Sequence, residues 1–376
     1  MHSDAASLLA IPHISVTPEN ALIDDKLYIR VSGLQKYQNV TLLNKVADNG
    51  IRFASSGCFR ANNEGIVDVS QDECLQGTYK GKDAMGLFWS LKPEPGYENK
   101  RLLKDDVSTP LVFHVLVYDG MYSWEELHKK SSTLEPLNST EINRWYKSPD
   151  VKRIDIHEGN LRGALFIPKG TGPFPAIIDM FGGIGGLVET RAALFASRGF
   201  LTLALAYFNY KDLPVNFYDV HYPYFLEAAS WMYNHPLALP GGIGTVGVSY
   251  GGVFSASMAT FLKEAWESDA KYLCLVGEDD QCLDSSYMDY WYSKWPSDQR
   301  HKVEYIKYPD TGHLVEPPYS PLHRTTTIRT PFKGLCFWGG TPEGHAHAQE
   351  DSWRRILDFL HTNVPVKSKQ TIKSQL

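Results

Sequence analysis

The chain has 376 residues, with 43 acidic and 37 basic side chains and a formal net charge of −6. This length exceeds that of one ordinary compact domain, so we expect two domains and at least one large core. The slight acidity and the lack of any block of like charges argue against nucleic acid or an acidic membrane surface as the partner.

The cysteines favour a reducing compartment, because they are odd in number, widely spread and form no CxxC pair. They are Cys58, Cys74, Cys274, Cys282 and Cys336. Residues Met1–Ile14 carry no Lys or Arg and include Pro12, so we expect no secretory signal. No run approaches the ~18 apolar residues of a membrane-spanning helix. The tripeptide Ser374-Gln375-Leu376 is close to the peroxisomal address Ser-Lys-Leu, and a chance match is the equal alternative.

Between about Ser15 and Gly120, apolar and polar residues alternate in short runs separated by turn residues such as Asn49-Gly50. Alternation with a period of two predicts strands, and the lack of helical runs between them predicts an antiparallel β-sandwich. The predicted strands are Leu27–Val31, Val40–Leu43, Ile66–Val69, Met85–Leu91 and Leu111–Val117. No cluster of titratable residues stands out here, which indicates a packing role for this part of the chain.

From Val151 onward, predicted strands alternate with predicted helices. This alternation is typical of an α/β domain with a mostly parallel sheet that carries helices on both faces. The predicted elements are a hairpin over Arg153–Pro168, strands over Pro175–Met180, Leu201–Tyr207 and Gly244–Val248, and helices over Glu189–Gly199 and His221–His235. We place the boundary in the polar stretch Leu137–Asp150, which gives a sandwich domain over residues 1–145 and a catalytic domain over residues 146–376.

The pentapeptide Gly247-Val248-Ser249-Tyr250-Gly251 stands between a predicted strand and a helical run over Gly252–Trp266. This is the layout of a nucleophile elbow, in which a sharp strand-to-helix turn exposes a serine hydroxyl at the top of a sheet. A Cβ at either outer glycine would collide with the neighbouring strand or helix, and the serine itself takes a strained backbone conformation. Ser249 is therefore the candidate nucleophile.

A serine nucleophile needs a base to accept its proton and a carboxylate to orient that base. In this architecture they follow in the order serine, acid, histidine. Asp280 follows the predicted strand Lys271–Gly277, and His313 follows the predicted strand His301–Tyr308. Both lie where ligands of open α/β sheets bind, so we predict a triad with Ser249. Glu278 and Asp279 are the alternative acids.

Two backbone amides are expected to bind the oxyanion that forms on the attacked carbonyl. One comes from the residue after the nucleophile, Tyr250, and the other from the glycine-rich loop after an early strand, Phe181–Gly186. Gly183 is the favoured second donor, with Gly182 as the alternative. A phosphate-binding loop is disfavoured, because no Gly-Lys-Ser/Thr follows.

His345 and His347 lie two residues apart and could be imagined as metal ligands. Residues two apart on a helix do not share a face, and structural zinc needs four ligands. A surface or packing role is the favoured interpretation.

Several longer runs resemble the family of type I acyl-CoA thioesterases and bile acid-CoA:amino acid N-acyltransferases, nearly from end to end. They are Asp179–Gly183, Gly185–Leu187, Ala204–Pro214, Ser257–Lys263, Val276–Asp280 and Tyr308–Tyr319. The resemblance implies a β-sandwich N-terminal domain, an α/β-hydrolase catalytic domain and a fatty or bile acyl-CoA substrate, without a cofactor. Ser249, Asp280 and His313 fall on the family's triad. Peroxisomal members end in tripeptides like Ser374-Gln375-Leu376, which implies a peroxisomal import receptor as partner, with the cytoplasm as the alternative location.

The identity of the nucleophile separates the two activities of this family. Transferase members use cysteine, whose thioester intermediate an amine can capture, whereas serine members pass the acyl group to water. Ser249 therefore indicates hydrolysis, with N-acyl transfer or carboxylester hydrolysis on the same scaffold as the alternatives.

The chain departs from the family at one place. Only 31 residues separate Ser249 from Asp280, enough for one helix and one strand. The family has a further strand and a long helical excursion there, so the missing part is on the order of 60 residues, more than a trimmed loop. Some enzymes of this fold carry the acid on the next strand after the nucleophile helix, which would keep the triad active. Otherwise the sheet has a gap and the domain is an inactive variant, and the sequence leaves both outcomes open.

Overall fold

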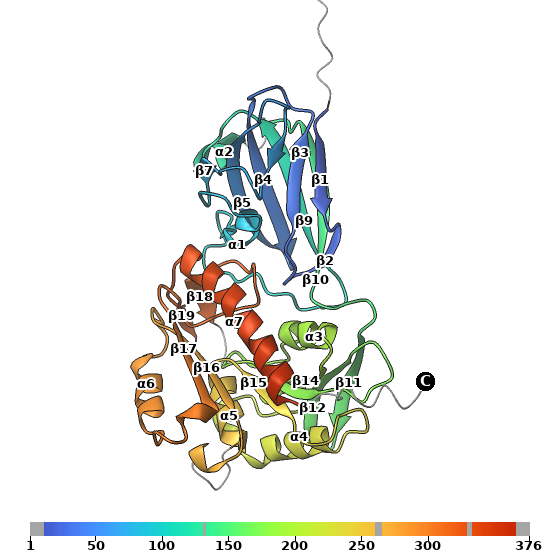
Figure 1. Ribbon diagram of the computed structural model, residues 1–376, viewed down its shortest axis with the longest axis vertical. Helices are drawn as coiled ribbons and strands as arrows, with labels where there is room; N and C mark the ends of the chain where they lie inside the picture. The colour runs from blue at the N-terminus through green and yellow to red at the C-terminus, as the bar shows by residue number, and fades with distance from the viewer. Residues whose placement is uncertain (1–10, 131–132, 260–264, 329–332, 366–376) are drawn as a thin grey trace, which may run out of the picture. The chain divides into compact units, whose positions relative to one another are not determined.

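The structure is a computed structural model that describes residues 11–130, 133–259, 265–328 and 333–365 (Figure 1). Its contacts divide the chain into two compact units. The first holds the chain up to Glu98, together with Pro110–Trp145 and Tyr319–Leu322. The second holds Asn99–Thr109, Tyr146–Pro318 and the chain from His323 onward. The main division lies between Trp145 and Tyr146, and each unit also takes a short segment from beyond it.

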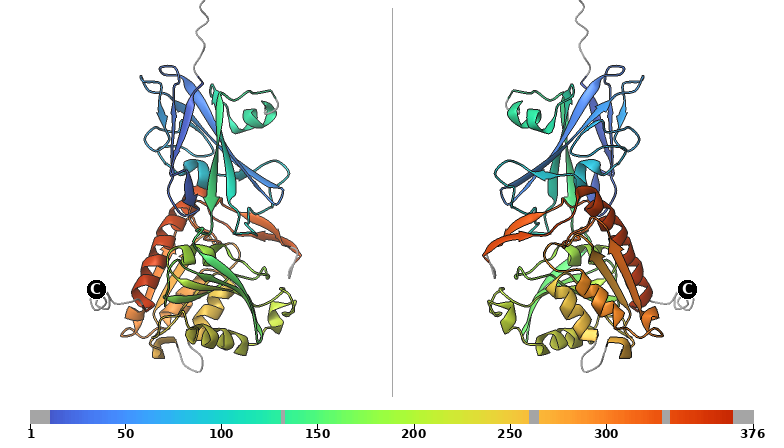
Figure 2. Two further views of the ribbon diagram at one scale, coloured as in Figure 1. Left: turned by 90° about the vertical axis from the view of Figure 1, so that its right-hand side faces the viewer. Right: turned by 90° about the vertical axis from the view of Figure 1, so that its left-hand side faces the viewer.

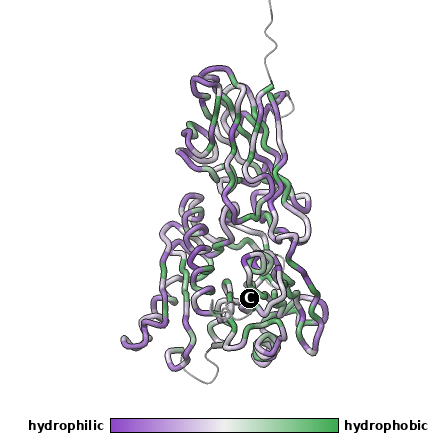
Figure 3. Tube along the Cα trace, turned by 45° about the vertical axis from the view of Figure 1, so that its right-hand side comes forward, coloured by the Kyte–Doolittle hydropathy of each residue, from purple (hydrophilic) through white to green (hydrophobic). Residues whose placement is uncertain are grey.

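The first unit is a β-sandwich, as the alternating pattern predicts. One sheet has the order β1-β3-β6, and the other has the order β2-β10-β9-β4-β5-β7 with β8 beside β5. Neighbouring strands are antiparallel except for β2 and β10. Apolar and polar stretches are interleaved along these strands (Figure 3). The strands are β1 (His13–Thr17), β2 (Asn20–Leu22), β3 (Tyr28–Ser32), β4 (Asn39–Asp48), β5 (Ile51–Arg60), β6 (Val67–Asp68), β7 (Gln76–Gly77), β8 (Lys92–Pro93), β9 (Leu111–Asp119) and β10 (Asn138–Trp145), with short helices α1 (Gly86–Trp89) and α2 (Trp124–Lys130).

The predicted strand Met85–Leu91 is wrong, because this segment forms helix α1. The carboxylate of Asp83 determines the local conformation. It accepts hydrogen bonds from the backbone N–H of Met85 at 2.7 Å and from Nε1 of Trp89 at 2.8 Å, which closes a helical turn. An apolar run as short as this one does not distinguish a buried strand from a buried helix.

The polar stretch Leu137–Asp150, in which we expected the boundary, contains strand β10 (Asn138–Trp145), and the main division follows directly after this strand. This strand pairs with β9 over seven residue pairs. Its side chain Arg144 is fully buried and donates to the carbonyl oxygens of Leu22, Ile23 and Asp25. The polar composition hid the strand because a buried guanidinium that donates to backbone carbonyls cannot be told from a surface arginine in the sequence.

The second unit contains a five-stranded sheet in the order β11-β12-β14-β13-β15. β12 runs antiparallel to β11 and β14, which confirms the predicted hairpin, and β13 runs parallel to β14 and β15. All six residues of β14 are buried, as expected for a central strand covered on both faces. The strands are β11 (Lys152–Glu158), β12 (Leu161–Ile167), β13 (Ala176–Met180), β14 (Leu201–Ala206) and β15 (Gly244–Gly247).

Helices cover both faces of this sheet, as the alternating pattern predicts. On one face, Phe195 of α3 stacks on Trp353 of α7 with ring centroids 4.9 Å apart. On the other, Phe225 of α4 stacks on Phe254 of α5 at 4.3 Å. The helices are α3 (Thr190–Ser197), α4 (Pro223–Tyr233), α5 (Tyr250–Ala259) and α7 (Pro342–Asn363), with the 3-10 helix η1 (Phe217–Asp219) before α4. No helix of the described residues is both long and apolar enough to cross a membrane.

The sheet is interrupted after β15. Strands β16 (Tyr272–Gly277) and β17 (Val303–Tyr308) form a separate parallel pair, and β15 pairs only with β13 among the described residues. The gap coincides with the short stretch after Ser249. A further hairpin of β18 (Thr325–Ile328) and β19 (Gly334–Phe337) extends away from the sheets (Figure 2). The remaining elements are η2 (Ala265–Glu267), α6 (Ser286–Ser293) and η3 (Arg300–Lys302). The unit is thus an α/β hydrolase in which, among the described residues, no strand joins β15 to the pair β16-β17.

Candidate active site

Ser249 lies in a tight turn between β15 and α5, with a backbone φ of 55° that non-glycine residues rarely adopt. The flanking glycines are required by space. A Cβ at Gly247 would lie 2.0 Å from the carbonyl oxygen of Gly251, and a Cβ at Gly251 would lie 2.3 Å from that of Met180. This steric arrangement presents the serine at the carboxyl end of the sheet.

His313 and Asp280 are in direct contact, although 33 residues separate them. Nδ1 of His313 lies 2.7 Å from Oδ2 of Asp280, and their side chains are 6% and 13% exposed. The other carboxylate oxygen, Oδ1, accepts the backbone N–H groups of Cys282 and Leu283 at 2.8 and 2.9 Å. Both oxygens of Asp280 are therefore engaged, which fixes the carboxylate against the imidazole.

The two alternative acids have other partners. Oδ2 of Asp279 accepts the backbone N–H of Gly340 at 2.8 Å, and Glu278 forms an ion pair with Lys307 at 3.1 Å. Neither forms a hydrogen bond with His313 among the described residues. Of the three consecutive acids, Asp280 is the one that contacts the histidine.

The backbone around His313 is held by residues near the start of α7. Its N–H donates to the carbonyl oxygen of Trp338 at 2.8 Å, and its ring stacks on the Trp338 ring with centroids 5.5 Å apart. The preceding amide, that of Gly312, donates to Nε2 of His345 at 2.9 Å.

His345 is 3% exposed, which agrees with the packing role favoured for it, and His347 is exposed. Burial lowers the pKa of His345 to about 4, against the opposing effect of the Asp279 carboxylate, so the ring stays neutral and Nε2 can accept a hydrogen bond. Sequence reasoning did not connect this histidine with His313. The described residues contain no group of three or more His, Cys, Asp or Glu side chains suited to a metal.

The glycine loop, Phe181–Gly186, lies directly against the elbow. A Cβ at Gly182 would lie 2.9 Å from Cβ of Ser249, and a Cβ at Gly183 would lie 3.1 Å from the ring of Tyr250. Within the described part of the chain, the backbone N–H groups of Gly182, Gly183 and Tyr250 donate to no protein acceptor. Unpaired amides are rare in buried backbone, so these three are free to bind a ligand oxygen.

One contact of a complete triad is not made. In the part of the chain that the structure describes, Ser249 Oγ has no hydrogen bond to His313. The hydrogen bond between a nucleophile and its base is often long in unliganded sites and shortens when substrate binds. The structure therefore shows two separate groups of contacts. His313 contacts Asp280, and Ser249 lies beside the glycine loop with its unpaired amides.

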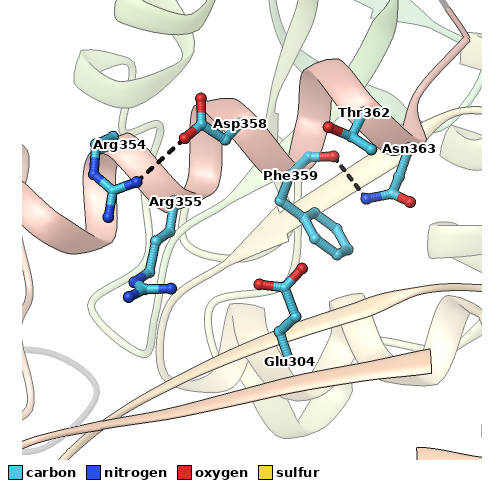
Figure 4. Close-up of a pocket in the computed structure, with 7 residues that line it drawn as sticks. All are labelled: Glu304, Arg354, Arg355, Asp358, Phe359, Thr362 and Asn363. Atoms are coloured by element: carbon cyan, nitrogen blue, oxygen red, sulfur yellow. Dashed lines mark hydrogen bonds and ion pairs between the residues drawn. The ribbon is translucent and has the colours of Figure 1, made fainter. Parts of the chain in front are cut away.

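A shallow pocket lies elsewhere, between α7 and β17 (Figure 4). It is lined by Glu304, Arg354, Arg355, Asp358, Phe359, Thr362 and Asn363. Its two arginines are paired with carboxylates of the same helix. None of the predicted site residues lines it. The tripeptide Ser374-Gln375-Leu376 lies outside the described residues.

Comparison with known proteins supports the resemblance seen in the sequence. Residues 24–158 match the family described as the acyl-CoA thioester hydrolase/BAAT N-terminal region. Residues 220–267 and 264–365 match the BAAT/acyl-CoA thioester hydrolase C-terminal family in two pieces. The second match breaks at the place where the sheet is interrupted.

Individual relatives share about a third of their residues with this chain. The chain is 35% identical to bile acid-CoA:amino acid N-acyltransferase of Mus musculus over 412 positions, covering 92% of this chain and 96% of the relative. It is 33% identical to acyl-coenzyme A thioesterase 3 of Mus musculus over 420 positions, covering 94% of each. Among solved structures, acylaminoacyl peptidase of Pyrococcus horikoshii matches with a TM-score of 0.43 and 12% identity, covering 92% of this chain and 60% of that one. A likeness at this level carries no argument about function.

The alignment with the N-acyltransferase also agrees with a shortened chain. It spans 412 positions, whereas 92% of 376 residues is about 346, so about 66 positions have no counterpart in this chain. Matches over both units and identities above 30% along most of the chain identify its family. The chain belongs to the acyl-CoA thioester hydrolase/BAAT family.

Proposed function

We propose that the chain hydrolyses acyl-CoA thioesters to a free acid and coenzyme A. His313 removes the proton of Ser249, whose oxygen attacks the thioester carbonyl and forms a tetrahedral intermediate. The amides of Gly183 and Tyr250 stabilise its oxyanion. Coenzyme A leaves as the thiol with the proton from His313, and His313 then activates a water molecule that releases the acid from the serine ester.

The contact between His313 Nδ1 and Asp280 Oδ2, at 2.7 Å, carries this proposal. A carboxylate in this position orients the imidazole with Nε2 free to act as the base and stabilises the imidazolium that forms. The strained turn at Ser249 and the unpaired amides beside it support the same chemistry.

Hydrolysis is favoured over transfer because the nucleophile is a serine. An oxygen ester is less reactive toward amines than the thioester that a cysteine would form. The relatives include N-acyltransferases, however, so amide formation is measured alongside hydrolysis. Peroxisomal targeting through Ser374-Gln375-Leu376 stays a prediction.

A matched pair of variants tests the acid. We expect Asp280→Asn to lower kcat for the release of free thiol from a long-chain acyl-CoA by about 10³- to 10⁴-fold, because the imidazole loses its orienting carboxylate. Asp279→Asn keeps an amide oxygen for the Gly340 N–H and should change kcat by less than about threefold. Equal losses in the two variants would contradict the assignment of Asp280.

The nucleophile is tested with a serine-reactive fluorophosphonate and with acyl acceptors. We expect the probe to label the chain at Ser249, and Ser249→Ala to abolish both labelling and thiol release. Folded protein that is not labelled would be a non-catalytic member of the family. Acyl amide formed with glycine or taurine, at rates comparable to free acid, would instead identify an N-acyltransferase.

A further inference from the structure

Tyr207 follows directly after β14, and its hydroxyl forms hydrogen bonds with the glycine loop Phe181–Gly186. Its ring packs against Phe208, Phe225 and Phe254 with centroids 5.2 to 5.6 Å apart. The hydroxyl donates to the carbonyl oxygen of Phe181 at 2.5 Å and to that of Gly182 at 3.0 Å. Two successive carbonyls of the loop are thereby turned toward the hydrophobic core and share one donor.

The direction of these carbonyls determines the direction of the next two amides. The peptide bonds after Phe181 and Gly182 are trans, so each C=O points opposite to the N–H of the following residue. With the Phe181 and Gly182 oxygens turned into the core, the N–H groups of Gly182 and Gly183 point away from it. A glycine loop without this anchor has many backbone conformations available, because its residues lack a Cβ.

The amides that Tyr207 turns outward are two of the three that lack a protein acceptor. Their loop lies against the nucleophile, since a Cβ at Gly182 would lie 2.9 Å from Cβ of Ser249. The hydroxyl also stays protonated and able to donate, because burial raises the pKa of Tyr207 well above its ordinary value. Ionisation therefore does not remove this hydrogen bond near neutral pH.

We propose that Tyr207 is a positioning residue for the oxyanion site: its single O–H holds the Phe181 and Gly182 carbonyls and so keeps the Gly182 and Gly183 amides aimed at the reacting carbonyl. The inference rests on the proposed acyl transfer at Ser249 for its catalytic consequence. Its structural content, that Tyr207 sets the orientation of the loop, is independent of that reaction.

Tyr224 provides a matched control. It belongs to the same core, and its hydroxyl donates to the carbonyl oxygen of Ala206, next to Tyr207 but outside the glycine loop. Tyr207→Phe removes a hydroxyl that donates to two backbone carbonyls, and Tyr224→Phe removes one that donates to a backbone carbonyl and accepts the backbone N–H of Arg162 at 3.2 Å. We expect similar small decreases in the thermal unfolding midpoint for both variants.

Steady-state kinetics separate positioning from general stability. We expect Tyr207→Phe to lower kcat for acyl-CoA hydrolysis about tenfold with KM changed less than about twofold, a fraction of the 10²- to 10³-fold cost of removing an oxyanion donor outright. Tyr224→Phe should keep both constants. Equal kcat values in the two variants, or a loss confined to KM, would overturn the positioning role.

A second measurement needs no turnover. The dipeptide Phe181-Gly182 is the only Phe-Gly in the chain, so ¹³C-carbonyl phenylalanine combined with ¹⁵N-glycine gives one correlated NMR signal. We expect this signal to move in both the ¹³C and ¹⁵N dimensions in Tyr207→Phe and to stay in place in Tyr224→Phe. A signal unmoved in Tyr207→Phe overturns the inference. If the wild-type chain releases no thiol while the signal still moves, the proposed function fails and the anchoring of the loop stands.

Discussion

Individual glycines at the elbow have different steric surroundings. A Cβ at Gly251 would meet the carbonyl oxygens of Met180 and Phe181 at 2.3 and 2.5 Å, whereas the nearest atom to a Cβ at Gly252 lies 3.5 Å away. Both glycines are in helix α5, so replacement by alanine has the same effect on helix propensity. Only the first replacement forces the elbow apart from strand β13.

We therefore expect Gly251→Ala to abolish fluorophosphonate labelling of Ser249 and to destabilise the chain by roughly 2 kcal/mol or more, as overpacking against backbone does. Gly252→Ala should keep labelling and stabilise by about 0.5–1 kcal/mol, as expected for glycine to alanine in a helix. Labelling rates and urea unfolding of both variants check this. Normal labelling of Gly251→Ala would refute the steric account.

His345 makes stability depend on pH. Its folded pKa of about 4 lies below the ordinary value of 6.5, so the unfolded chain binds a proton that the folded chain does not as pH falls. The free energy of unfolding therefore decreases from about pH 6.5 down to pH 4 and is unaffected by this group above that window. His323, whose pKa burial also lowers, acts in the same direction.

His345→Gln keeps an oxygen that can accept the Gly312 N–H but does not titrate. We expect His345 to lower the free energy of unfolding of the wild type by about 2 kcal/mol between pH 7 and pH 5. The decrease in the variant should be smaller by this amount. Urea unfolding at the two pH values measures the difference. His347→Gln, at the exposed neighbouring histidine, is the control and should follow the wild type. An unchanged pH dependence in His345→Gln would show that this ring is not buried in its neutral form.

The secondary-structure elements that border the gap in the sheet have fewer strand partners than those at its centre. α5 has no charged residue, yet the side chain of Val253 on it is 56% exposed. Among the residues that the structure describes, β15 pairs only with β13, while β16 and β17 pair only with each other. An isolated pair of strands is marginally stable, so local opening is easier here than in β13 and β14.

Amide hydrogen exchange tests this difference. We expect amides of β16 and β17 to exchange at least about tenfold faster than those of β13 and β14, because their opening does not require the five-stranded sheet to unfold. Exchange rates averaged over each strand, read by mass spectrometry of peptides, give the comparison. Equal protection of the two sets would mean that the unit opens only as a whole.

At the scale of the whole molecule, the second unit depends on a segment that precedes it in the chain. Arg101, from Asn99–Thr109, pairs with Glu316, and their side chains are 3% and 13% exposed. The backbone carbonyl of Asn99 also accepts the N–H of Thr327 at 3.1 Å. Removing one partner of a buried ion pair leaves a costly unpaired charge.

A truncated chain that begins at Tyr146 lacks this segment. We expect it to be less stable than the second unit in the full chain by about 3 kcal/mol or more, because Glu316 is left without its guanidinium. Glu316→Gln in the truncated chain should recover part of the loss by removing the charge. Thermal unfolding of the three proteins checks this. A truncated chain as stable as the full one would show that Asn99–Thr109 contributes nothing to the second unit.

The sequence by itself determined the features that depend on local sterics and periodicity. These are the elbow at Ser249 with its glycines, the alternation of strands and helices after Val151, the sandwich before it, and the stretch too short to complete the sheet. The tertiary structure decided which of three consecutive acids contacts His313, that His345 accepts the N–H of Gly312, and that the Tyr207 hydroxyl donates to the glycine loop. It also decided that Met85–Leu91 contains helix α1 rather than a strand, that a polar segment is strand β10, and that β15 has one strand neighbour, β13, in the described part of the chain. Each of these depends on partners distant in the sequence, where hydrogen-bond satisfaction and packing space override local propensity.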